Sequence, residues 1–129
     1  MIEYRTVFVL DTSESGGTGD IPLSCQLQYN PDDPFTVNHS FMVVPNPVWW
    51  QYGRDILIDA MMQPAGDGDV RAWVDGEKFY MHLKSPEGHA RIWCPLSEME
   101  EFVRLMVLMV PIGEESFDID RELQAFMEG

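Results

Sequence analysis

The chain has 129 residues, 45% of them hydrophobic, and 22 acidic residues against 8 basic ones give a formal net charge of −14. This length and composition are typical of one globular domain with a hydrophobic core, so we treat residues 1–129 as a single domain and exclude a disordered chain. The charge argues against a partner recognised through its phosphates, because Lys and Arg supply that affinity.

Three strands are expected at the start of the chain. Residues 3–10 are rich in β-branched and aromatic side chains, and apolar residues alternate with polar ones along 21–29 and 35–43. A Ser/Gly-rich loop separates the first two strands. Prolines at 45 and 47 end the third strand.

A helix is expected to follow, because the apolar spacing changes after residue 49. It starts near Trp49 and ends before Pro64. The residues that fall on one helical stripe are Gly53, Ile56, Leu57, Ala60 and Met61.

The second half of the chain predicts a three-stranded meander over residues 69–74, 78–83 and 89–94. Asp75-Gly76 favours a tight hairpin turn between the first two of these strands, and the turn sequence Ser85-Pro86-Glu87-Gly88 separates the last two. The three strands are therefore expected to be antiparallel.

Two further helices are expected near the C-terminus. Ser97 and Glu100 match a capping box for a helix over 98–109, and Asp118 or Asp120 can cap a short helix after it. The resulting order, βββα-βββαα, predicts an α+β fold with a mostly antiparallel sheet.

No pattern in the sequence predicts a catalytic residue, a cofactor or a metal site. Cys25 and Cys94 are isolated, and we expect both to be free and buried. His39, His82 and His89 lack a Cys or acidic partner at ligand spacing. We therefore expect a protein that is not an enzyme, and a small enzyme remains an alternative.

The sequence predicts neither membrane insertion nor secretion. Its longest uninterrupted apolar stretch, 105–110, is far shorter than the roughly 20 residues that span a bilayer. The N-terminus has no basic region followed by an apolar one, as a signal peptide would have. We expect a cytoplasmic protein.

Aromatic residues and an arginine gather where the first of these helices is expected to begin. Trp49, Trp50 and Tyr52 precede Arg54, and large aromatic residues and Arg are enriched at the energetically important positions of protein interfaces. One interpretation is a packed helix with a solvated charged face. The other is a contact surface, for which Trp49, Trp50 and Arg54 are the candidate partner-binding residues.

Several blocks of the sequence form a pattern that covers nearly the whole chain. They are YNPDDPFTV (29–37), WQYGRDIL (50–57), QPAGDGDVRAW (63–73), SPEGHA (85–90), VPIGEE (110–115) and FDIDREL (117–123). In this order the blocks strongly resemble the SsgA-like proteins, the actinomycete family that controls sporulation-specific cell division. The chain departs from the usual family pattern at Gly53, at Met61-Met62 and in the Met-rich stretch 106–109.

The resemblance implies a non-enzymatic regulator that acts at the division septum through protein–protein contacts, by recruiting the FtsZ ring or by directing septal cell-wall remodelling. It also implies a homotrimer with a whirly-like single-strand-binding-protein fold, and FtsZ or other SsgA-like proteins as partners. Nucleic acid is not expected as a partner, because a sheet that holds single strands needs a basic face. A whirly-type nucleic-acid module remains an alternative.

Overall fold

A seven-stranded antiparallel sheet and two helices make up the computed structural model, which describes residues 1–13 and 19–116. The elements are β1 (Ile2–Asp11), β2 (Ile21–Asn30), β3 (Asp33–Phe41), β4 (Val48–Gly53), α1 (Arg54–Ala60), β5 (Val70–Asp75), β6 (Lys78–Ser85), β7 (Gly88–Pro95) and α2 (Leu96–Met109). They confirm the predicted α+β class and antiparallel sheet. The helix expected near residue 119 lies outside the described residues.

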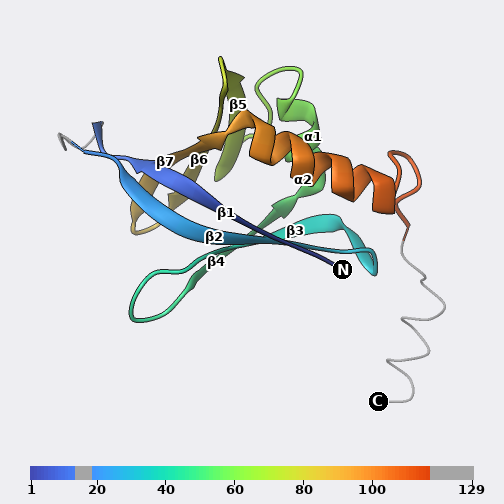
Figure 1. Ribbon diagram of the computed structural model, residues 1–129, viewed down its shortest axis with the longest axis horizontal. Coiled ribbons are helices and arrows are strands. Elements are labelled where there is room, and N and C mark those ends of the chain that lie inside the picture. Colours follow the sequence, from blue (N-terminus) through green and yellow to red (C-terminus); the bar gives the residue numbers. More distant parts are fainter. Residues whose placement is uncertain (14–18, 117–129) are drawn as a thin grey trace.

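Two meanders, β1–β4 and β5–β7, join where β1 pairs with β7, and the strand order is β4-β3-β2-β1-β7-β6-β5. The junction is short, running from Val9 opposite Trp93 to Asp11 opposite Arg91. Beyond it, α2 contacts β1, β6 and β7, and the rings of Tyr4 and Phe102 lie 5.9 Å apart. In Figure 1, α2 lies between the β5 end of the sheet and the β1–β2 hairpin, where it fills the opening between the two meanders.

The predicted start of the first helix is wrong, because residues 48–53 form strand β4 instead. This strand pairs with β3, with Trp50 opposite His39, and α1 begins only at Arg54. The aromatic run Val-Trp-Trp-Gln-Tyr suits a strand, and its residues alternate between the core and the outer side of the sheet. The later part of the helical stripe is confirmed, since Leu57 and Ala60 are buried.

The predicted capping box of α2 is also wrong. The helix begins at Leu96, so Ser97 lies within its first turn, and no side chain caps the helix at Pro95. The backbone N–H of Leu96 instead donates to the carbonyl of Glu77, at 2.8 Å. A neighbouring hairpin turn thus satisfies one of the amide groups that a helix start leaves without a partner.

The core lies between the inner faces of the two meanders and the helices. Tyr52 of β4 reaches across it, and its hydroxyl lies 3.9 Å from the sulfur of Met81 in β6. Cys25 and Cys94 are free and buried, as predicted. None of the helices in the described part of the chain is long and apolar enough to cross a membrane. Fully buried side chains of the core include Phe8, Leu27, Tyr29, Val37, Leu57, Phe79, Met81, Phe102 and Met106.

Candidate functional site

Arg54 lies in the interior of the protein, with an exposed fraction of only 1%. Its Nη1 donates to the Val110 carbonyl at 2.7 Å and to the Tyr29 hydroxyl at 3.1 Å, and its Nη2 forms an ion pair with Glu115. We call Arg54, Tyr29, Val110 and Glu115 the Arg54 cluster. It ties the segment after α2 to β2 and α1, so this guanidinium holds parts of one chain together rather than lying on the surface.

The electrostatics of the Arg54 cluster follow from its geometry. The hydrogen bond from Arg54 lowers the pKa of Glu115, and burial raises the pKa of Tyr29. The Tyr29 hydroxyl also donates to the Pro34 carbonyl at 2.8 Å. A buried charge is costly unless it is paired and hydrogen-bonded, so these partners are what allows Arg54 to be buried.

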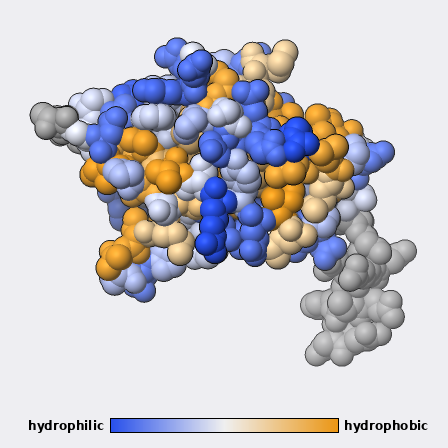
Figure 2. Space-filling view, viewed as in Figure 1, coloured by the Kyte–Doolittle hydropathy of each residue, from blue (hydrophilic) through white to orange (hydrophobic). Residues whose placement is uncertain are grey.

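Trp49 lies on the outer side of β4 with 55% of its surface exposed. Three other exposed apolar residues, Met42, Val44 and Val48, belong to the same β3–β4 hairpin, and Val44 is 96% exposed. Val48 lies on the same side of β4 as Trp50, so we call Trp49, Met42 and Val44 the hairpin surface. Residues 35–53 include no Asp, Glu, Lys or Arg. In Figure 2 this hairpin projects at the lower left, where hydrophobic atoms lie beside hydrophilic ones, so the surface is neutral and partly apolar.

Trp50 faces the opposite side of β4 from Trp49. It is half-buried, contacts the core, and lines a pocket of about 270 Å³ together with residues of the β6–β7 hairpin. The three candidate residues therefore do not form one surface. Trp49 is exposed, Trp50 lies against the core, and Arg54 is inside the protein.

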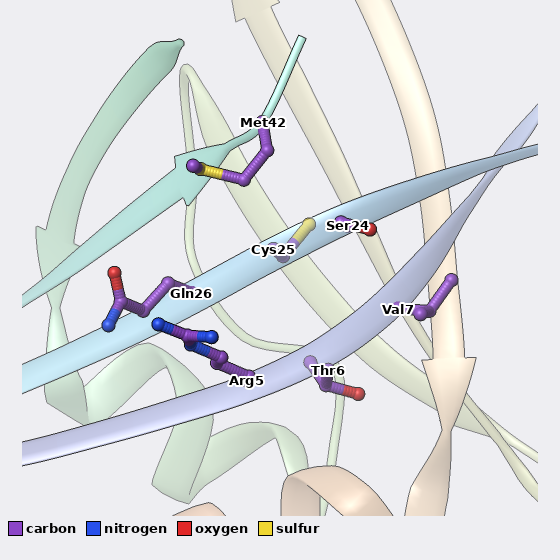
Figure 3. A pocket seen from close by; sticks show the side chains of 7 residues that line it. All are labelled: Arg5, Thr6, Val7, Ser24, Cys25, Gln26 and Met42. Atoms are coloured by element: carbon purple, nitrogen blue, oxygen red, sulfur yellow. The ribbon is translucent and has the colours of Figure 1, made fainter.

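A second pocket, of about 410 Å³, is lined by residues of β1 and β2 and shares Met42 with the hairpin surface. Figure 3 shows the Arg5 guanidinium pointing toward the side chain of Gln26, which is its cross-strand partner. Sequence reasoning did not find this pocket, because its walls come from β1, β2 and the residue that follows β3, and only the strand pairing brings them together. The residues that line it are Arg5, Thr6, Val7, Ser24, Cys25, Gln26 and Met42.

The side chains best suited to catalysis are held in neutral forms by burial. Burial raises the pKa of the Cys25 thiol to about 12 and lowers that of His39 to about 3. His39 Nδ1 lies 2.9 Å from the Tyr52 hydroxyl, deep in the core. Neither group is therefore a ready nucleophile or acid at neutral pH. Within the described residues, no three His, Cys, Asp or Glu side chains are grouped to hold a metal ion.

The outer face of β5–β7 carries a different set of side chains. Trp73 of β5, Tyr80 of β6 and Trp93 of β7 lie opposite one another in a row across the sheet, and Arg71, His82 and Arg91 form the next row. The pairing of Arg71 with His82 does not follow from the predicted turn at Asp75-Gly76. The observed two-residue loop is Gly76-Glu77, with Asp75 opposite Lys78, whereas a loop at 75–76 would place Arg71 opposite Tyr80.

Comparison with known proteins agrees with the resemblance in the sequence. Residues 23–115 match a family model described as Streptomyces sporulation and cell division protein, SsgA. The sporulation-specific cell division protein SsgB of Frankia casuarinae is 35% identical over 120 residues, which cover 88% of this chain and 84% of the relative. SsgB of Thermobifida fusca is 36% identical over 110 residues, which cover 80% of each chain.

Solved structures give the same result. An SsgA-like sporulation-specific cell division protein from Thermobifida fusca superimposes with a TM-score of 0.82 at 31% identity, over 97% of this chain and 94% of that one. An SsgB structure, from work relating its mutations to longitudinal cell division during sporulation of Streptomyces coelicolor, gives a TM-score of 0.79 at 29% identity, over 88% and 91% of the two chains. Sequence and fold agree over most of the chain, and this protein therefore belongs to the SsgA family of sporulation and cell division proteins.

Proposed function

We propose that this protein regulates septation during sporulation without catalysing a reaction, by binding other proteins at the division septum through the hairpin surface. The observation that carries the proposal is the exposure of Trp49 among other apolar, uncharged side chains. Exposed apolar patches of this kind mark sites of protein interaction, and Trp is enriched among residues that dominate binding energy. The names of the relatives support the cellular process.

Two kinds of partner fit this surface: further copies of the chain, in a homotrimer, and a division protein such as FtsZ or another SsgA-like protein. Copies that each carry a charge of −14 repel one another over most of their surface. Contacts between residues of the charge-free segment 35–53 avoid that repulsion. Nucleic acid is not proposed as a partner, because the net charge opposes the approach of phosphates.

Replacing Trp49 by Ala tests the role of the hairpin surface. A fluorescent fusion of the Trp49→Ala variant should no longer gather at septa of sporulating cells, while its melting temperature stays near that of the unchanged protein. The matched control is Leu108→Ala on α2, which removes another exposed apolar side chain far along the sequence. Normal septal localisation of Trp49→Ala, or its loss in both variants, would contradict the proposal.

Light scattering after size exclusion separates the two kinds of partner. The unchanged protein should have about three times the mass of one 14.8 kDa chain. If Trp49→Ala keeps that mass but loses localisation, the hairpin surface binds another division protein. If the variant is a monomer, the surface joins the subunits. A monomeric unchanged protein at micromolar concentration would refute the trimer.

A further inference from the structure

Basic side chains gather on the outer face of β5–β7, in a protein that is otherwise strongly acidic. Four of the eight Lys and Arg residues of the chain lie there, and alternation along the strands places them on the side opposite the buried residues Ala72, Met81 and Ile92. We call the following residues the cationic face: Arg71, Lys78, His82, Lys84, His89 and Arg91.

The charge balance of this region sets it apart from the rest of the chain. Between residues 69 and 95 the four basic residues equal the four acidic ones in number, so the whole net charge of −14 lies outside this segment. Asp75 lies on the face itself, Glu77 and Glu87 lie in the two turns, and Asp69 precedes β5. An acidic ligand therefore meets less repulsion at the cationic face than at the remaining surface.

In the aromatic row beside these cations, each ring has a contact within the face that covers one of its sides. The rings of Trp73 and Tyr80 stack on each other, with centroids 5.5 Å apart and planes within 7°. Lys78 Nζ lies over the Trp93 ring at 4.1 Å from its centroid. Single-stranded nucleic acid is held largely by bases stacked on exposed rings. The geometry therefore favours a ligand recognised by its charge rather than by stacking.

Two cations of the face are available to such a ligand. Arg91 is already paired with Asp11 at 2.7 Å, whereas Arg71 and Lys84 are exposed and form no ion pair among the described residues. Arg71 lies opposite His82, two positions from Lys84, so the two cations are diagonal neighbours about 7–8 Å apart at the backbone. The first and third residues of an extended peptide are about 7 Å apart and point to the same side.

We propose that the cationic face binds an extended acidic segment of a partner protein, with carboxylates at alternate positions that pair with Arg71 and Lys84. The His82–His89 pair, whose ring nitrogens lie 3.3 Å apart, adjoins both cations and supplies further polar contacts. This site is separate in sequence and in sheet position from the hairpin surface. It gives the protein a second docking surface, selective for acidic sequences with the right spacing.

The test is an NMR titration of the full chain with the peptide acetyl-Leu-Asp-Leu-Asp-Leu-amide. Chemical-shift changes should map to β5, β6 and β7, and binding should weaken as salt rises. Arg71→Gln and Lys84→Gln should each weaken binding by about 1.4- to fivefold, the range expected of exposed ion pairs. Arg104→Gln, which removes an exposed cation of α2, should leave the affinity unchanged.

Two further peptides and an oligonucleotide make the test decisive. A peptide with Asn in place of Asp should not bind detectably, and one with two adjacent Asp residues should bind more weakly than the alternating one. Equal affinity for all three peptides would overturn the proposal, as would binding that survives loss of both cations. Tighter binding of oligothymidylate to the same face would assign it to nucleic acid instead. Melting temperatures of the variants show that each is folded.

Discussion

Trp49 and Arg54 are five residues apart in the sequence, yet the structure gives them opposite environments. The large apolar ring is 55% exposed, whereas the charged guanidinium is 1% exposed. Arg is almost never fully buried unless it is paired, and Arg54 meets that condition through its ion pair with Glu115. The contrast shows that an aromatic–arginine sequence typical of interfaces can combine an outward contact residue with an internal tether.

The contacts of Trp49 and Arg54 also differ in how far apart the partners are in the sequence. The partners of Trp49 are local, since β3 and β4 form one hairpin. Arg54 instead joins residues that are 25 to 61 positions away, in β2 and in the segment after α2. Removing Arg54 should therefore disturb the fold, and removing Trp49 should disturb only what the surface binds.

The largest effect is expected from Arg54→Ala. Breaking a buried ion pair from one side typically costs about 3–5 kcal/mol, because the remaining polar groups lose their partner. Urea unfolding should show this loss in the free energy of unfolding. Arg104→Ala, which breaks an exposed i,i+3 pair with Glu101, is the control and should change it by less than about 1 kcal/mol. Equal losses of unfolding free energy in the two variants would contradict the expectation that the buried ion pair stabilises the fold more than the exposed one.

Tyr29→Phe should have the next largest effect. The substitution keeps the ring and removes a hydroxyl that accepts from Arg54 and donates to the Pro34 carbonyl. Leaving these two groups unsatisfied should cost about 1–3 kcal/mol, measured in the same unfolding experiment. The control is Tyr80→Phe, which removes a hydroxyl from a half-buried ring on the outer face of the sheet. An equal loss of unfolding free energy in this variant would show that the hydrogen bonds of Tyr29 in the Arg54 cluster do not contribute more to stability than an ordinary tyrosine hydroxyl.

Alternation and turn residues were enough to predict most of the sheet. The pattern along residues 21–29 and the turn at Asp75-Gly76 gave strands close to those observed. Strand β4 was missed because Gly53, Ile56 and Leu57 fit a helical stripe, which was extended backward over residues whose own preference is for a strand. Here a longer periodic pattern obscured a short strand next to it.

The candidate site was only partly predictable for a different reason. Trp49 could be chosen from its residue type, but the burial of Arg54 depends on Glu115, which is 61 residues away and has no local relation to it. Such a contact becomes visible only when α2 is placed on the sheet. The cationic face was partly predictable, because alternation along β5 and β6 places Arg71 and His82 on the same side of the sheet. Their direct pairing was not predictable, because the observed loop is Gly76-Glu77 and not Asp75-Gly76.

A smaller effect should appear in the pH dependence of stability. The hydrogen bond from Arg54 lowers the pKa of Glu115 from its ordinary value of 4.5. A carboxylate whose pKa is lower in the folded state than in the unfolded state stabilises the folded state. The stabilisation is complete at pH values above the unfolded-state pKa, and it is lost as the pH falls through the folded-state pKa. The stability advantage of the unchanged protein over Glu115→Gln should therefore shrink below pH 4.5.

Glu114→Gln provides the control for this measurement. It removes the same charge from the exposed neighbouring residue and leaves the contact with Arg54 in place. The urea midpoint of unfolding is measured at a series of pH values from neutral to acid. The midpoints of Glu115→Gln and of the unchanged protein should approach each other as the pH falls. Curves that stay parallel through the acid range would show that the ion pair does not shift the titration of Glu115.

The smallest effect on stability is expected from Trp49→Ala. Because about half of the Trp49 ring is already in water, removing it takes little buried apolar area out of the folded protein. The free energy of unfolding should fall by about 1 kcal/mol or less. Tyr52→Ala, three residues along the same strand, removes a ring that is only 6% exposed and should cost about 3–5 kcal/mol. If the two losses were alike, Trp49 would be part of the core, and a loss of septal localisation in Trp49→Ala could no longer be attributed to a missing contact surface.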